Sequence, residues 1–367
     1  MDNQPFAGTP VEKPPMDQRA PARPAIARSE QRKVNLALQG GGTHGAFTWG
    51  ALERLLEDDR IDIEAVCGTS AGAMNAAMLV QGLARGGRAG AISLLERFWR
   101  AIAAGHTMSP FQNTPFERML WGHDLTYSMA YNTLDALSRV ISPYQANPFT
   151  LEINPLRQVV DQFLDAEFLR ASPEAIRLFV TATNVRTGKA RIFTREEIST
   201  EVMMASACLP NAFKAVEIDG EAYWDGGYMG NPALWPLYYE RGAADIVLVQ
   251  INPLRRDELP KTTADIMNRL AEISFNAALT AEMRAIDFVQ RLLDAGRLEQ
   301  PRYRRMFLHA IEDEDRMRRF KLSTKLNGSW DFLQTLRQYG REAAERFLTE
   351  SYPMLGRDST LDIQKYL

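Results

Sequence analysis

The chain has 367 residues, 45% hydrophobic and 24% charged, which is enough apolar material for one large or two modest globular domains and excludes disorder as its overall state. Its formal net charge of -3 excludes a global field that would attract it to nucleic acid or to an anionic membrane. Cys67 and Cys208 are its only cysteines, too few for a disulfide framework or a four-thiolate metal site, so a reducing compartment such as the cytoplasm fits best.

The first 32 residues differ in composition from the rest of the chain. They contain six prolines and a single aromatic residue, Phe6, so they bury too little surface to offset the entropy of ordering. We predict a disordered Pro-rich tail over residues 1–32. Its start is not that of a secretory signal, and the stretch 71–84 is shorter than the roughly 20 apolar residues of a membrane span. We therefore expect a soluble protein whose contact with a membrane is peripheral.

The pattern changes after the tail to alternating strands and helices. Val34–Leu38 is a short apolar run that predicts a strand entering a glycine turn, and residues 47–56 repeat apolar positions at helical spacing. Ile61–Cys67 predicts a second strand, and Ala71–Val80 predicts a helix of small residues. This alternation is typical of the α/β class, with a mainly parallel sheet flanked by helices.

Later segments extend the same sheet. Ala175–Thr183 and Ala244–Ile251 are apolar, β-branched runs of the length expected for buried strands. Between them, Asp219-Gly220 separates Phe213–Ile218 from Glu221–Trp224, which is a strong signal for a two-residue hairpin.

The remainder of the chain predicts helices. Thr262–Asp265 resembles a capping box, and it opens an apolar stripe that runs from Ile266 to Leu292 and ends before Gly296. We predict an α/β domain over residues 33–255 and a helical C-terminal extension over residues 256–367 that packs on it.

Gly40–Gly45 forms the first of three glycine-marked turns. Lying between a strand and a helix, it can point backbone N–H groups at an anion, either an oxyanion or, because it also reads G-x-G-x-x-G, a dinucleotide pyrophosphate. The dinucleotide interpretation requires an acidic residue at the end of the next strand, and Asp62 and Glu64 come too early. A plain tight turn is the third interpretation.

The second turn, Gly68–Gly72, matches G-x-S-x-G. Ser70 lies where a strand meets a helix, at the sharp elbow that exposes a nucleophilic hydroxyl. The alternative is a helix N-cap with glycines that only permit close packing. From this motif alone the two interpretations are about even.

The third turn is Asp225-Gly226-Gly227, which by itself is more typical of a simple turn. A serine nucleophile needs a base, however. One candidate arrangement is Ser70, Asp225 and His309, which has the chain order of an α/β-hydrolase triad.

Four motifs in this order resemble those of the patatin-like phospholipases. They are Gly40–Gly45, Gly68–Gly72, Ala205–Pro210 and Asp225–Gly227. The resemblance covers residues 34–255, and its specificity lies in the order and spacing of the motifs. It implies a patatin-like three-layer sandwich over the α/β domain.

The resemblance also implies roles for individual residues. Ser70 would attack an ester carbonyl, Asp225 would act as the base without a histidine, and Gly40, Gly41 and Gly42 would line the oxyanion hole. The glycines implied to support these motifs are Gly45, Gly68, Gly72, Gly226 and Gly227. In the family the glycine loop usually carries Arg or Lys at the position of His44 and often Asp at that of Gln39. An Asp with an ordinary pKa of about 3.9 is a weak base, so we expect burial to raise it.

We therefore expect a serine acyl hydrolase that cleaves lipid esters, of phospholipids or lysophospholipids, without metal or organic cofactor. The alternatives are a thioesterase or neutral-ester lipase with the same dyad, a dinucleotide-binding module and a catalytically silent lipid-binding protein. Residues 98–150, with nine aromatic and six charged residues, suit a lid or acyl-chain channel, or else a buried helical subdomain. The basic segment 302–325 is interrupted by acidic residues, which favours a solvated face over a nucleic-acid site.

Overall fold

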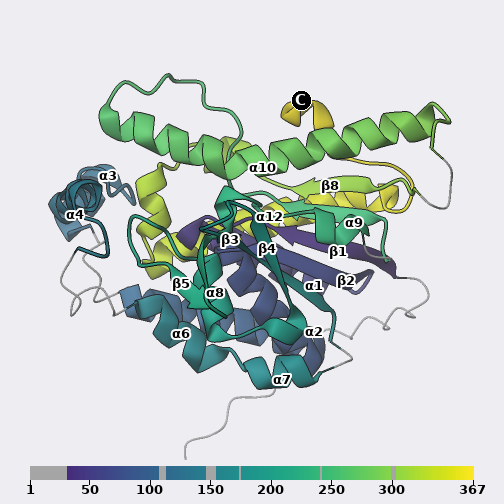
Figure 1. Cartoon of the computed structure of the whole chain (residues 1–367), viewed down its shortest axis with the longest axis horizontal. Helices are drawn as coiled ribbons and strands as arrows, with labels where there is room; N and C mark the ends of the chain where they lie inside the picture. The colour runs from purple at the N-terminus through teal and green to yellow at the C-terminus, as the bar shows by residue number, and fades with distance from the viewer. Residues whose placement is uncertain (1–30, 107–112, 146–153, 173–174, 240–241, 299–302) are drawn as a thin grey trace, which may run out of the picture.

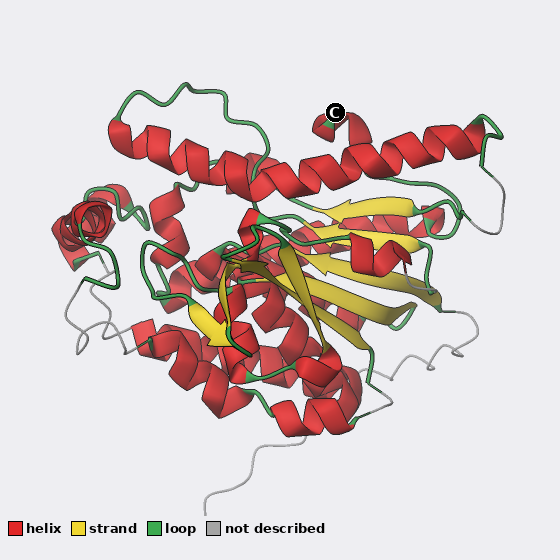
Figure 2. Cartoon of the chain, viewed as in Figure 1, coloured by secondary structure: helices red, strands yellow, loops and turns green. Residues whose placement is uncertain are grey.

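A mixed sheet forms the middle layer of the computed structural model, with helices on both of its faces (Figures 1 and 2). The structure describes residues 31–106, 113–145, 154–172, 175–239, 242–298 and 303–367. All but the last two residues of the predicted disordered tail lie outside these ranges, and Arg32 already belongs to the first strand.

The described strands are β1 (Arg32–Leu38), β2 (Ile61–Thr69), β3 (Arg177–Asn184), β4 (Ala190–Thr194), β5 (Val216–Ile218), β6 (Glu221–Asp225), β7 (Asp245–Val249) and β8 (Phe307–Ile311). Their order is β5-β6-β3-β2-β1-β7-β8, and β4 also pairs with β3. The neighbouring strands β3, β2, β1, β7 and β8 are parallel to one another. Strands β4, β5 and β6 pair antiparallel. The mainly parallel sheet flanked by helices that the sequence predicts is confirmed.

The described α-helices are α1 (Gly45–Glu57), α2 (Ala71–His106), α3 (Pro115–Trp121), α4 (Met129–Val140), α6 (Pro155–Phe163), α7 (Ala166–Ala171), α8 (Thr200–Ser206), α9 (Trp235–Tyr239), α10 (Thr263–Asp294), α11 (Glu314–Met317) and α12 (Trp330–Arg346). Helix α2 is much longer than the segment predicted, and it bends where Gly86 and Gly87 leave helical φ/ψ values. Helix α10 begins at the predicted cap, because the Thr262 side chain accepts from Asp265 N.

The sheet is buried on both faces, which explains why its central strands are apolar at nearly every position. Along β1, Leu36 belongs to the cluster packed by α1, α2 and α12, and Ala37 belongs to the cluster on the opposite face with α9 and α10. Figure 1 shows α10 lying across one face of the sheet, with α1, α2, α6 and α7 on the other side.

The C-terminal third of the chain contributes helices to the layers on both faces of the sheet and a strand to the sheet itself. It supplies α10, and α12 packs closely on α1, where the backbones meet at Gly50 and Gly340. It also supplies β8, which pairs with β7 at the sheet edge. The segment predicted as a helical extension therefore also contains a strand of the central sheet.

Candidate active site

Ser70 occupies a sharp turn between β2 and α2, at the carboxyl end of the parallel strands. Its φ is 55°, a left-handed value that a side-chain-bearing residue adopts only where the surroundings impose it. Glycine is needed at position 72, because a Cβ there would collide with Leu38 O. Ser70 N donates to the hydroxyl oxygen of Ser206 at 2.9 Å, which holds the elbow from the end of α8. This is the geometry of a nucleophile elbow, with Ser70 retaining 9% exposure.

Asp225 ends β6 and lies against this elbow. Its Oδ1 accepts from Gly227 N at 2.7 Å, and the carboxylate lies close enough to the Ser70 side chain that this hydroxyl lowers the pKa of the carboxyl. The backbone on either side is fixed, since Asp225 N donates to Cys208 O and the Thr183 hydroxyl donates to Asp225 O. The structure thus brings together the two residues that the sequence singled out as nucleophile and base.

Burial changes the acidity of Asp225. The residue is 1% exposed, and this burial raises the pKa of its carboxyl to about 6 against the opposing effects of Gly227, Ser70 and the positive charge of Lys325. At neutral pH the carboxylate is mostly ionised and is a much stronger base than an exposed aspartate.

The glycine loop passes directly in front of Ser70, because a Cβ on Gly40 would collide with Thr69 O and the Ser70 side chain. Gly40 N is not free, since it donates to Asn231 Oδ1 at 2.6 Å. In the described part of the chain no acceptor is recorded for the amides of Gly41 and Gly42. Of the three glycines predicted to form an oxyanion hole, these two therefore have an N–H left for a substrate.

Two asparagines and Gln39 anchor the loop, and sequence reasoning did not identify the asparagines. Gln39 Oε1 accepts from the backbone N of Ile251 and Asn252, both at 3.0 Å, so the Gln39 side chain ties the end of β1 to the end of β7. Asn252 Nδ2 in turn donates to Gly40 O at 2.7 Å. The single signal common to Asn231 and Asn252 is a following proline, which is typical of ordinary turns as well.

His44 lies in the same loop but carries no charge. Its Nε2 is 2.7 Å from the Thr324 hydroxyl, and its ring packs near Phe320 and Phe332. Burial, reinforced by the charges of Lys325 and Arg256, holds the pKa of His44 well below its usual value. The loop therefore obtains no positive charge from this imidazole near neutral pH.

The alternative triad is not assembled. His309 lies in β8, where its Nε2 pairs with Asp245 at 3.0 Å and its Nδ1 lies 2.9 Å from the Thr360 hydroxyl. Asp245 is the first residue of β7, at the end of the strand away from the elbow. His309 is thus a buried structural residue with its own carboxylate partner.

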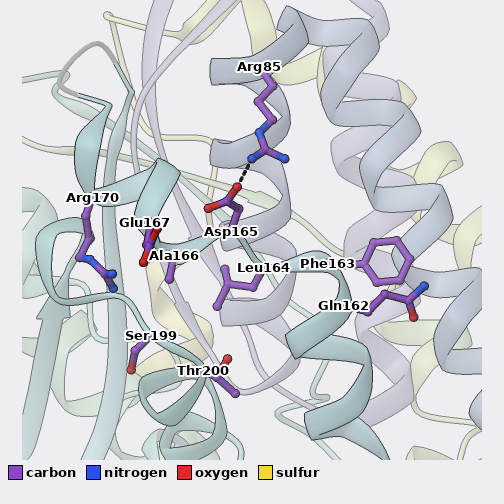
Figure 3. Close-up of a pocket in the computed structure, with 10 residues that line it drawn as sticks. All are labelled: Arg85, Gln162, Phe163, Leu164, Asp165, Ala166, Glu167, Arg170, Ser199 and Thr200. Carbon is purple, nitrogen blue, oxygen red and sulfur yellow. Dashed lines mark hydrogen bonds and ion pairs between the residues drawn. The ribbon is translucent and has the colours of Figure 1, made fainter.

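A polar hollow beside α7 lies away from this site and does not include any of its residues (Figure 3). Figure 3 shows Arg85 and Asp165 pointing toward one another as an ion pair, and Arg170 donates to Ile198 O. Its cations are already engaged. No group of three or more metal-ligating side chains occurs among the described residues.

Within residues 98–150, the described helices α3 and α4 expose apolar side chains. Met119 and Met129 are both 82% exposed, which contradicts a buried subdomain for this part. The segment is tied to the C-terminal third of the chain, because the Ser323 hydroxyl donates to Asp124 Oδ1 and Asn327 Nδ2 donates to His123 O. In the view of Figure 1, α3 and α4 are on the same side of the molecule as the N-terminal end of α10.

The same end of α10 adds further exposed apolar residues. They are Ile266, Met267, Leu270 and Ile273.

No helix among the described residues is both long and apolar enough to cross a membrane.

Comparison with known proteins places this geometry in context. The family model for patatin-like phospholipases matches residues 36–238. Similar solved structures include VipD from Legionella pneumophila, with 17% identity and a TM-score of 0.34 over 84% of this chain and 67% of that one. They also include ExoU, in its complex with SpcU from the type III secretion system of Pseudomonas aeruginosa, with 14% identity and a TM-score of 0.32 over 86% of this chain and 52% of that one. The chain thus spans about two thirds of VipD and half of ExoU, and no curated protein matches it.

Proposed function

The chain belongs to the patatin-like phospholipase family and is a lipid acyl hydrolase, and on that premise we propose that it cleaves carboxylic esters of phospholipids or lysophospholipids with a Ser70–Asp225 dyad. The observation that carries this proposal is the position of the buried carboxylate of Asp225 against the Ser70 elbow, close enough that the Ser70 hydroxyl lowers the pKa of the carboxyl. No histidine of the described chain takes the place between them.

In the first half of the reaction, Ser70 Oγ forms a bond to the ester carbonyl carbon while its proton passes to Asp225. The carbonyl oxygen becomes negative, and the amides of Gly41 and Gly42 are the donors available to stabilise it. Collapse of this tetrahedral intermediate breaks the bond to the alcohol, which leaves with the proton from Asp225. The products of this half are the free alcohol, or lysolipid, and an acyl group on Ser70.

In the second half, water takes the place of the alcohol. Asp225 accepts a proton from the water as its oxygen attacks the acyl carbon, and the same two amides stabilise the second oxyanion. The carboxylic acid then leaves, Ser70 recovers its proton and the dyad returns to its starting state. Atoms and charges balance without a metal or an organic cofactor.

We propose that the exposed apolar residues of α3, α4 and the start of α10 meet the lipid surface. Many large apolar side chains are exposed on these helices, which is unusual on a protein surface unless something covers them, and they include methionines, whose flexible side chains suit an irregular partner. A protein that takes its substrate from a bilayer needs exposed apolar side chains to meet the lipid, so these residues support a lipid substrate over a water-soluble thioester.

The proposal is tested by measuring hydrolysis of phosphatidylcholine, lysophosphatidylcholine, monoacylglycerol and acyl-CoA side by side, with Ser70→Ala as the control. We expect the phospholipid or lysophospholipid to be cleaved fastest and a fluorophosphonate to label the wild type but not the variant. Preference for acyl-CoA would favour a thioesterase, and preference for monoacylglycerol would favour a neutral-ester lipase. A wild-type protein that neither hydrolyses these esters nor reacts with the fluorophosphonate would refute the dyad.

A further inference from the structure

The glycine loop is covered by a short turn from the C-terminal third of the chain, η5 (Leu322–Leu326). The backbone carbonyl of Lys325 packs so closely on Gly42 that a Cβ on that glycine would collide with it. The Thr43 hydroxyl donates to Thr324 O at 2.9 Å, and His44 is 2.7 Å from the Thr324 hydroxyl. This turn lies about 85 residues beyond the end of the family match.

Lys325 also reaches the loop through its side chain. Lys325 Nζ donates to Asn252 Oδ1 at 2.6 Å. The amide nitrogen of Asn252 then donates to Gly40 O at 2.7 Å and to Gln39 Oε1 at 3.1 Å. Because an ammonium group only donates, it requires the oxygen of the amide on its own side and so turns the nitrogen toward the glycine loop.

Lys325 is surrounded by other charged groups, but among them it is the cation that affects the pKa of Asp225. Glu272 on α10 is already paired with Arg256 at 2.6 Å and with Arg269 at 3.1 Å. Asp225 lies at the end of β6, and His44 in the glycine loop is neutral. Lys325 is the one side chain whose positive charge lowers the pKa of Asp225 appreciably among the described residues.

We propose that Lys325 is a positioning residue of the hydrolase, whose ammonium group holds Asn252 against the glycine loop. This inference rests on the proposed function of the dyad. It assigns part of the active site to the C-terminal third of the chain, whereas the sequence grouped Lys325 with a solvated basic face.

The proposal predicts two limbs in the dependence of kcat/KM on pH. On the acid side the rate rises as Asp225 loses its proton, with a midpoint near its pKa of about 6. On the alkaline side it falls as Lys325 loses its proton, because burial lowers the pKa of that ammonium to about 8, with Arg256 lowering it further and Glu272 and Asp225 opposing. The charge and the strong hydrogen bond to Asn252 weaken together in that range.

The test compares Lys325→Met and Lys325→Arg with Lys365→Met as a matched control. Lys365 is a lysine of the same region that pairs with Glu312 on the surface. We expect Lys325→Met to lower kcat/KM by roughly 10- to 100-fold, the range for loss of a hydrogen bond to a charged group. Its acid limb should move to higher pH, because Asp225 loses the charge that lowers its pKa, and the alkaline limb should disappear.

Lys325→Arg should keep the acid limb and move the alkaline limb upward, because a guanidinium stays charged throughout the range. Lys365→Met should leave both limbs where they are. A folded Lys325→Met variant with reduced activity and unmoved limbs would show a packing role only and would overturn the proposal. If Lys325→Met does not fold, an unmoved alkaline limb in Lys325→Arg would also overturn the proposal. A wild type that hydrolyses no ester and takes up no fluorophosphonate would instead refute the dyad itself.

Discussion

Replacing Asp225 with asparagine should abolish catalysis and at the same time stabilise the fold. The carboxyl has a pKa of about 6 in the folded chain and about 3.9 when exposed, so ionised Asp225 opposes folding by ~3 kcal/mol, at about 1.4 kcal/mol for each unit by which the pKa is raised. Because the folded value is the higher one, the folded state binds the proton more tightly. The stabilisation from binding this proton is fully present below pH ~4 and is lost as pH rises through about 6, where the ionised carboxylate begins to oppose folding.

The Asp225→Asn variant removes this pH dependence. The substituted amide oxygen can still accept from Gly227 N, but without the charge that strengthens that bond, so part of the gain is lost. We expect the free energy of unfolding to exceed that of the wild type by about 1–3 kcal/mol at pH 8, and by less than about 1 kcal/mol at pH 4. Ester hydrolysis should fall on the order of 10³-fold or more, as for loss of a catalytic base.

Urea denaturation followed by circular dichroism at pH 4, 6 and 8 measures the stability difference. Asp219→Asn is the matched control, because Asp219 is exposed in the hairpin turn and has a positive φ that asparagine also adopts. It should change neither stability nor activity appreciably. A less stable Asp225→Asn variant at pH 8, or a stability gain that does not grow with pH, would refute the reasoning from burial.

Three further predictions concern residues around the dyad. A folded His309→Ala variant should retain most of its kcat, whereas a triad member would lose on the order of 10⁴-fold; collapse of catalysis in folded protein would restore the triad. Ser206→Ala leaves the buried Ser70 amide without its acceptor and should lower both kcat and the free energy of unfolding, the latter by about 1–3 kcal/mol. Ser199→Ala, at the other end of α8, removes only a helix cap, so equal losses of kcat in both variants would contradict a specific role for Ser206. Met119→Glu with Met129→Glu should remove activation by phospholipid vesicles while preserving hydrolysis of a monomeric short-chain ester, and equal activation in wild type and variant would show that α3 and α4 do not meet the lipid.

Local sequence patterns predicted the structure correctly where a few adjacent residues determine the backbone conformation. Asp219 and Gly220 have φ values of 51° and 78°, as a two-residue hairpin turn requires, and they join β5 to β6 as predicted. The elbow at Ser70 follows from the same kind of signal, since glycine at positions 68 and 72 provides the space that this turn needs. In each case the information lies within five consecutive residues.

Other features depend on residues far apart in the chain, so no local pattern shows them. Strand β8 is only five residues long and has His309 at its centre. It pairs with β7, and Asp245 and Thr360, both distant in sequence, provide partners for the buried imidazole. In the same way Asn252 has no distinctive sequence context, and its role arises because β7 ends beside the glycine loop. The order of the motifs predicts the dyad but not the residues that fix its surroundings.

The environment of the glycine loop shows why the C-terminal third of the chain cannot be regarded as an appendage to the matched family region. The family match contains both members of the dyad, but it ends before Asn252 and Lys325, which hold the loop from the outside. The loop cannot replace them, because burial keeps its own His44 uncharged. Removal of this part of the chain would also expose the β7 edge and the face of α1 that α12 covers. The same segments thus complete the core and supply a positive charge that lowers the pKa of Asp225, so we expect their removal to reduce both stability and catalysis.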